Sequence, residues 1–112
     1  MASRSLIAAS FTPIVLSLLS HGEAYGYDII RRIEDLSDGT LKWSAGTMYP
    51  VLHRLESRGY IRSILRPSAT GPERKYYSLT KKGHQALENE KRQWLDVHNV
   101  LIKLWGPQLQ FG

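Results

Sequence analysis

The sequence has no cysteine among its 112 residues. Disulfide bonds and thiolate metal sites are therefore excluded. Histidine, another common metal ligand, occurs four times at spacings that match no metal motif, and we expect neither a metal nor a cofactor. The four residues are His21, His53, His84 and His98.

Long apolar runs are also missing. The stretch from Leu6 to Leu19 is interrupted by three polar residues and a proline, so it falls short of the roughly 18 apolar residues that cross a bilayer. The amino terminus has a lone Arg4 and no small-residue cleavage site after a clean apolar core. We expect a protein of the cytoplasm without a membrane partner.

The features that an enzyme needs are absent as well. No nucleophile with a neighbouring base, no carboxylate pair and no phosphate-binding loop can be assembled from these residues. We therefore expect a protein that is not an enzyme.

Positive charge is plentiful, and it is concentrated in one part of the chain. The net charge is +5, yet residues 44–84 alone carry eight basic and two acidic residues, so the rest of the chain sums to −1. Such a segment suits a surface that binds phosphates, because neutralising phosphates releases counterions. The alternative is a basic face that is merely solvated.

Helical periodicity, caps and turn residues divide the chain into helices and strands. The expected helices cover residues 12–20, 25–37, 44–58 and 80–104. The expected strands are a short one at 41–43 and a hairpin of 60–66 and 74–79 with a polar tip at 67–72. The stretch before Thr12 is either a preceding helix or an arm.

This order predicts a mainly α fold with a small β-hairpin, the winged helix-turn-helix, followed by a long C-terminal dimerisation helix. The DNA-binding domain would occupy residues 1–80 and the dimerisation helix residues 81–106. Residues 107–112 would form a short tail.

The third helix should carry the base-reading residues. Its inward face is apolar, whereas Ser44, Thr47, His53 and Arg54 point outward, which suits insertion into the major groove. Ser44 should also cap the helix. Tyr49 has two open interpretations, contact with the DNA backbone or half-buried packing.

The hairpin should grip DNA through less specific contacts. Arg66, Arg74 and Lys75 lie beside its polar tip, where they could follow the phosphate backbone or reach a minor groove. Neighbouring strand residues point to opposite faces, so only one of Tyr76 and Tyr77 can be buried. We expect it to be Tyr77.

The last helix presents apolar residues near a heptad spacing. A homodimer would cover this seam and would match a palindromic operator in double-stranded DNA. The alternative is a helix that folds back as ordinary core. Trp94 could anchor the dimer, which we favour, or line a ligand cavity. The seam residues are Leu87, Trp94, Val97, Leu101 and Leu104.

Three ordered motifs resemble the PadR family of bacterial transcriptional regulators. Residues 25–29 (YGYDI) resemble its second helix, and residues 46–56 (GTMYPVLHRLE) with Gly59 resemble its recognition helix. Its wing and the start of its last helix are matched by Gly71-Pro72, residues 74–77 (RKYY), Leu79-Thr80 and Gly83. The likeness extends from about Pro13 to Gly83. Met48 departs from it, since leucine is usual there.

The resemblance implies a homodimeric repressor that leaves its operator when an effector binds, often a phenolic or drug-like aromatic compound. It also implies the short branch of the family, without a further C-terminal dimerisation domain. Some relatives place an aromatic residue of the dimerisation helix, here Trp94, against a flat ligand. The competing hypothesis is a winged-helix protein–protein interaction module without specific DNA binding.

Overall fold

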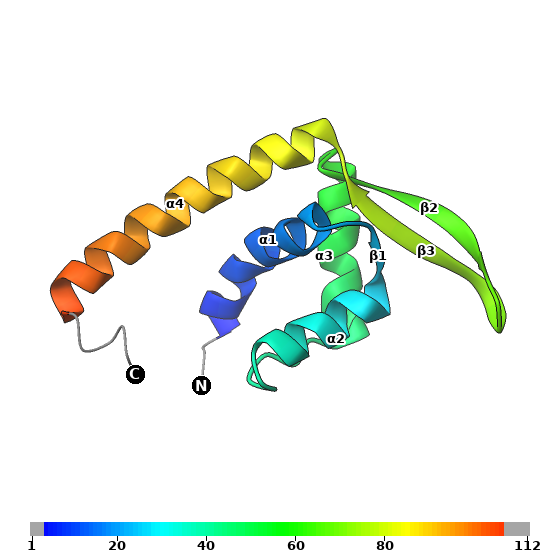
Figure 1. The fold of residues 1–112 in the computed structure, drawn as a ribbon, viewed down its shortest axis with the longest axis horizontal. Helices are drawn as coiled ribbons and strands as arrows, with labels where there is room; N and C mark the ends of the chain where they lie inside the picture. Colours follow the sequence, from blue (N-terminus) through cyan, green and yellow to red (C-terminus); the bar gives the residue numbers. More distant parts are fainter. Residues whose placement is uncertain (1–3, 107–112) are drawn as a thin grey trace.

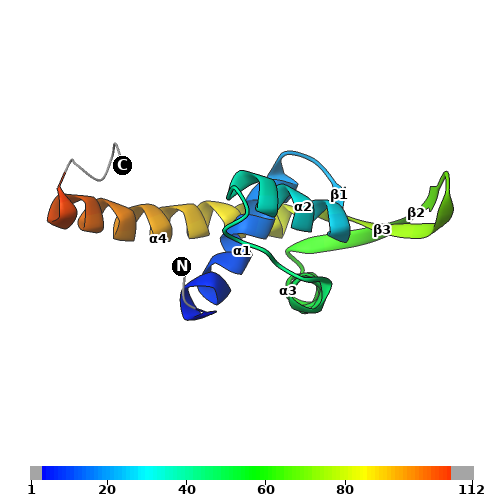
Figure 2. The same ribbon diagram turned by 90° about the horizontal axis from the view of Figure 1, so that it is seen from below.

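The computed structural model describes residues 4–106 of the chain. The helices are α1 (Arg4–Ser20), α2 (Gly26–Leu36), α3 (Ala45–Ser57) and α4 (Lys81–Trp105). The strands are β1 (Ala24–Tyr25), β2 (Ile61–Ser68) and β3 (Gly71–Leu79). The first three helices pack together, the β2–β3 hairpin projects from one side, and α4 extends the opposite way (Figures 1 and 2). The predicted winged helix-turn-helix architecture is confirmed.

One apolar core joins the helices to the sheet, because each helix turns an apolar stripe toward the same centre. Met48, Leu52 and Leu55 of α3 have no exposed surface, and Val51 beside them is also buried. The predicted inward face of α3 is therefore confirmed. The other members of the core include Val15, Leu16, Ile29, Ile33, Ile61, Tyr77 and Leu87.

The first helix begins earlier than predicted. We expected Thr12 and Pro13 to start it, but α1 runs from Arg4 and contains Pro13 in its interior. Of the two alternatives for the preceding stretch, the helix is correct. Phe11, two residues before the proline, packs edge-on against the ring of Trp43 with a centroid distance of 4.4 Å. Tertiary packing of this kind outweighs the backbone bond that an internal proline removes.

The sheet also differs from the prediction. The strand expected at 41–43 does not form; these residues lie in the α2–α3 connection, where burial of Trp43 and partial burial of Leu41 produce the alternating pattern. The third strand is instead β1, which pairs antiparallel with β3 through Ala24 and Tyr25. The strand order is β1-β3-β2.

The hairpin is longer than predicted, since Pro67 and Pro72 both lie within its strands. A register shift between Arg66 and Ser68 accommodates the first proline. Prolines are tolerated at bulges and sheet edges, where no ladder bond is lost.

Helix α4 begins at the predicted cap, where the Thr80 hydroxyl accepts a hydrogen bond from the Gly83 N–H at 3.0 Å. None of the described helices is long and apolar enough to cross a membrane. The predicted tail, residues 107–112, lies outside the described residues.

Gly83 fixes how α4 leaves the domain, and Gly83→Ala should destabilise the fold. A Cβ atom there would overlap the Tyr60 carbonyl oxygen, which already accepts hydrogen bonds from the N–H and hydroxyl of Thr80. We expect a loss of about 1–3 kcal/mol in the free energy of unfolding, measured with urea and circular dichroism.

The matched control is Gly46→Ala, also in a helix. The nearest atom within 4 Å of a Cβ there is Ser44 Oγ, at 3.7 Å. This variant should keep or slightly raise the stability. Equal stability of Gly83→Ala and the native chain would contradict the close contact.

Candidate nucleic-acid interface

The start of α3 is built as an exposed, capped helix N-terminus. Ser44 Oγ accepts a hydrogen bond from the Thr47 N–H at 3.2 Å, which confirms the predicted cap, and the Ser44 hydroxyl lies 3.3 Å from Thr47 Oγ1. The backbone amides in the first turn of a helix attract anions. Ser44 and Thr47 are both exposed.

The outer surface of α3 combines small and basic groups. The predicted residues His53 and Arg54 are both exposed there. Gly46 and Pro50, which belong to the motif of residues 46–56 but were not predicted as contact residues, are exposed on the same outer face. Because neither has a long side chain, another surface can approach the helix backbone closely there. Arg58 was also missed, although its spacing of four from Arg54 places both on one flank of the helix.

Tyr49 packs against α2, as one of its two interpretations proposed. A Cβ atom at Gly26 would lie 2.7 Å from the Tyr49 hydroxyl oxygen and 2.8 Å from ring carbons, so the ring rests on the glycine. Tyr49 remains 44% exposed. This contact sets the distance between α2 and α3, the two helices of the helix-turn-helix.

The two faces of the hairpin carry different groups. One face turns toward α3: the Ser63 hydroxyl donates a hydrogen bond to the Glu56 carboxylate at 2.7 Å, and Lys75 shares this face with Tyr77. Tyr77 is buried, as predicted. Burial raises the pKa of its hydroxyl, and the nearby Glu56 carboxylate raises that pKa further.

The opposite face of the hairpin holds Arg66 and Arg74. Arg66 Nη2 lies 2.9 Å from each carboxylate oxygen of Glu23, just before β1. Arg74 lies over the ring of Tyr25, 4.7 Å from its centroid. The three predicted hairpin cations therefore do not share one face, since Lys75 is on the other side.

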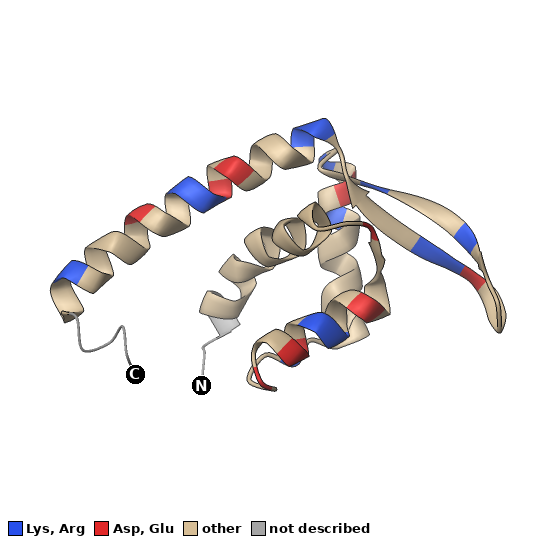
Figure 3. Ribbon diagram, in the orientation of Figure 1, with Lys and Arg blue, Asp and Glu red and all other residues tan. Residues whose placement is uncertain are grey.

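Glu23 and Tyr25 were not predicted from the sequence. They reach the hairpin through β1, whose two residues give no local strand signal, and Glu23 is 43 residues from its partner Arg66. Figure 3 shows the basic residues of the middle segment spread over α3 and the hairpin, with acidic residues between them.

The seam predicted on α4 divides into a covered part and an uncovered part. Leu87 requires a correction: it is only 3% exposed and belongs to the core of its own domain, so it is not available to a partner. Trp94, Val97 and Leu104 are 37%, 56% and 75% exposed, and Leu101 is partly exposed.

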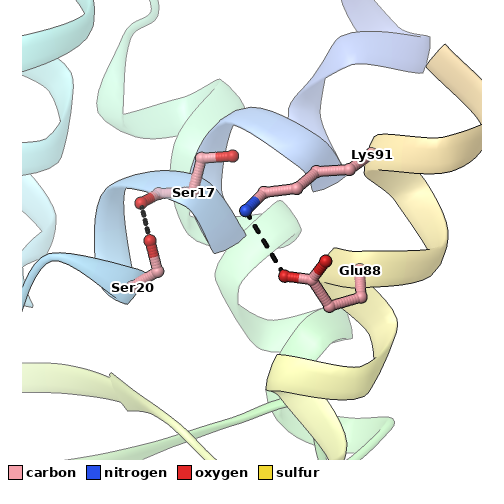
Figure 4. Close-up of polar contacts among 4 residues, drawn as sticks. All are labelled: Ser17, Ser20, Glu88 and Lys91. Carbon is pink, nitrogen blue, oxygen red and sulfur yellow. Dashed lines mark hydrogen bonds and ion pairs between the residues drawn. The ribbon is translucent and has the colours of Figure 1, made fainter. Parts of the chain in front are cut away.

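Helices α1 and α4 lie side by side near the domain and diverge toward the start of α1 (Figures 1 and 2). Figure 4 shows the region where they run together, with the ion pair between Glu88 and Lys91 of α4, 3.4 Å long, beside Ser17 and Ser20 of α1. Farther along α4, Leu6 of α1 and Trp94 and Val97 of α4 line an open hollow. The apolar stripe of α4 thus continues beyond the cover that α1 provides.

Comparison with known proteins decides the family. The model of the PadR-like family of transcriptional regulators matches residues 15–89, which is more than half of the chain. The chain belongs to this family. It is therefore a transcriptional regulator of a DNA-binding type and not an enzyme, as the sequence motifs implied.

Individual relatives agree with this assignment. This PadR-like regulator is 27% identical to an uncharacterised protein of Lysinibacillus sphaericus over 90% of this chain and 93% of that one. It is 34% identical to the transcriptional regulator YqjI of Escherichia coli over 71% of this chain, a match that spans only 37% of YqjI.

Solved structures match over nearly the whole chain. A transcriptional regulator from Clostridium thermocellum has a TM-score of 0.83 at 30% identity, with 92% of this chain and 97% of that chain covered. A PadR-like regulator from Bacillus cereus has a TM-score of 0.80 at 29% identity, with 92% and 98% covered. A PadR family regulator from Clostridium difficile has a TM-score of 0.73 at 31% identity, with 87% and 99% covered.

The ion pair on the hairpin yields a prediction for Glu23→Gln. The neutral amide would release Arg66 and remove a negative charge near the hairpin, so DNA affinity at low salt should rise several-fold. The slope of log affinity against log salt concentration should steepen by up to about one. Fluorescence anisotropy with a labelled duplex at several salt concentrations measures both.

Glu73→Gln is the matched control, because it removes the same charge from the hairpin without releasing Arg66. Its slope should equal that of the native protein. A Glu23→Gln slope no steeper than the control would show that Arg66 gains no phosphate contact when it is released.

Proposed function

We propose that this PadR-like regulator is a sequence-specific repressor that binds a palindromic operator in double-stranded DNA as a homodimer and responds to a ligand. The observation that carries the proposal is the exposed outer surface of α3, which combines an exposed helix N-terminus, capped by Ser44, with small, polar and basic side chains. It acts in the cytoplasm, where the DNA is.

Base readout is assigned to the outer face of α3. Thr47 and His53 offer hydrogen-bonding groups to base edges in the major groove, and Ser44 and the first amides of the helix meet a phosphate. Arg54, on the flank shared with Arg58, contacts a guanine edge or the backbone. Tyr49 contributes the exposed edge of its ring at the border of this surface.

Phosphate contacts are assigned to the hairpin. Its length carries the tip beyond α3, so the two faces can meet the two walls of a neighbouring minor groove. Lys75 contacts phosphates on the side of the minor groove that faces α3, and Arg66 and Arg74 contact phosphates on the opposite side. Arg66 is divided between Glu23 and the phosphate, because an ion pair whose side chains are 48% and 39% exposed is weak, so Glu23→Gln should complete its phosphate contact.

Dimerisation is assigned to the uncovered stripe of α4. The helix buries Leu87 within its own domain and then presents an apolar stripe that is partly exposed at Trp94 and Leu101 and more exposed at Val97 and Leu104. A second copy that packs its own α4 into the opening between α1 and α4 would bury both stripes. Trp94, at the middle of this surface, is the anchor.

The proposal requires DNA binding that depends steeply on salt. With duplex DNA from upstream of the gene, the double variant Arg74→Ala/Lys75→Ala should flatten the slope of log affinity against log salt concentration by up to about two. Thr47→Ala should instead reduce the preference for this DNA over a scrambled duplex and leave the slope unchanged.

Fluorescence anisotropy against both duplexes gives both quantities. Weak DNA binding that disappears as the salt concentration rises, with no preference between the two duplexes, would contradict the proposal. It would favour a winged-helix module that binds other proteins.

The dimer surface predicts opposite results for two substitutions two residues apart. Val97→Lys places a charge in the apolar stripe and should convert the dimer to a monomer and lower operator affinity at least tenfold. Asn99→Lys places the same side chain on the far side of the helix and should preserve the dimer.

Sedimentation velocity reports the mass of each variant, and circular dichroism checks that α4 remains helical. A native protein that sediments as a monomer, or a Val97→Lys variant that remains dimeric, would contradict this interface.

A further inference from the structure

A groove lies between α1 and α2, and none of its lining residues belongs to the outer surface of α3 or to the apolar stripe of α4. Its volume is about 650 Å³, within the range of small-molecule sites. The lining is largely apolar, with polar groups confined to one serine, one histidine and one arginine. It consists of Pro13, Ile14, Ser17, Leu18, His21, Arg32 and Leu36.

Arg32 is the residue that determines which kind of ligand this groove can bind. It is half-buried, yet no carboxylate of the described residues lies within 4.0 Å of its guanidinium. Its neighbour Arg31 pairs with Asp28 at 3.8 Å and lies over the Tyr27 ring. Asp28 and Asp35, one turn away on α2, border another hollow that Arg32 also touches, and neither pairs with it. A half-buried guanidinium without a partner favours an anionic ligand.

The apolar part of the groove requires an apolar ligand body. Leu36, on the lining of the groove, is 75% exposed, so its apolar surface is available to a ligand. His21, at the end of α1, adds a second nitrogen donor on the same lining. A neutral apolar compound would leave Arg32 without a partner, and a cation would be repelled by it.

We propose that the α1–α2 groove binds a small amphipathic organic anion, an aromatic or aliphatic carboxylate, whose apolar body lies between the helices and whose carboxylate faces Arg32. This site is distinct from the surface around Trp94. It supplies the effector site for the ligand-responsive regulator proposed above, and in that respect rests on the proposed function.

The position of the groove links it to DNA binding. Helix α2 lines the groove at Arg32 and Leu36, and at its other end Gly26 supports the ring of Tyr49 from α3. A ligand that shifts α2 relative to α1 therefore shifts the support of α3. Thermodynamic linkage makes the effect reciprocal: the factor by which the ligand changes the affinity for the operator equals the factor by which the operator changes the affinity for the ligand.

Isothermal titration of the DNA-free, full-length protein with 2-naphthoate and its neutral analogue 2-naphthamide tests the site. We expect the carboxylate to bind about tenfold more tightly or better, because a charge-assisted hydrogen bond is stronger than a neutral one. Arg32→Gln should abolish this preference, and Arg32→Lys should restore part of it. Arg31→Gln, the adjacent control, should leave it intact.

Three results would overturn the site. The first is equal binding, or no binding, of the two compounds to the native protein. The second is loss of naphthoate binding in Trp94→Ala together with its retention in Arg32→Gln, which would place the ligand on α4. The third is conversion of a dimer to a monomer by Leu36→Gln in sedimentation velocity, which would show that a second copy covers the groove.

The regulatory consequence has its own readout. Saturating 2-naphthoate should lower operator affinity of the native protein and of Arg31→Gln several-fold but leave Arg32→Gln unaffected. Unchanged operator affinity of the native protein would overturn the regulatory role. The titration contains no DNA, so it tests the ligand groove alone. A failure of operator binding would count against the proposed function and would leave the result of the titration unchanged.

Discussion

The packing of one apolar stripe of α3 into the core is the constraint on which the rest of the structure depends. Met48, Leu52 and Leu55 are completely buried, and each such side chain contributes roughly 1.5–3 kcal/mol relative to an exposed one. This burial fixes the rotation of α3 about its axis. The opposite face, with Thr47 and His53, is thereby held outward without any polar contact of its own being required.

Two glycines set how the other elements meet this core. Gly26 lets the ring of Tyr49 rest on the start of α2, and Gly83 lets the backbone at Tyr60 approach α4. Through these contacts, a displacement of α2 or α4 is transmitted to α3 and the hairpin. The proposed ligand groove and the proposed dimer surface lie on those two helices, so both can affect the face that meets DNA.

Much of the fold follows from local signals, and the differences have physical causes. The cap at Ser44 and the spacing of Met48, Val51, Leu52 and Leu55 were sufficient for α3. Thr12 and Pro13 match the residue pattern of a helix start, but α1 continues through them because its residues on both sides pack against the core. The two residues of β1 form a strand only because β3 lies beside them, a relation that no local pattern contains.

The candidate site was predictable in its residue types more than in its geometry. Outward positions on α3 follow from helical periodicity, whereas the division of Arg66 and Lys75 between two hairpin faces depends on register. The pairing of Arg66 with Glu23 joins distant parts of the chain. Heptad spacing likewise grouped Leu87 with Trp94, because it cannot distinguish a residue buried in its own domain from one left for a partner.

The central claim is that a symmetric pair presents α3 twice to one face of DNA, with a hairpin on each flank. Hydroxyl-radical footprinting on DNA from upstream of the gene tests it most directly. The account predicts two protected segments of equal strength, with centres about one helical turn, roughly 34 Å, apart, and weaker protection outside each. A single protected segment, or none, would contradict it.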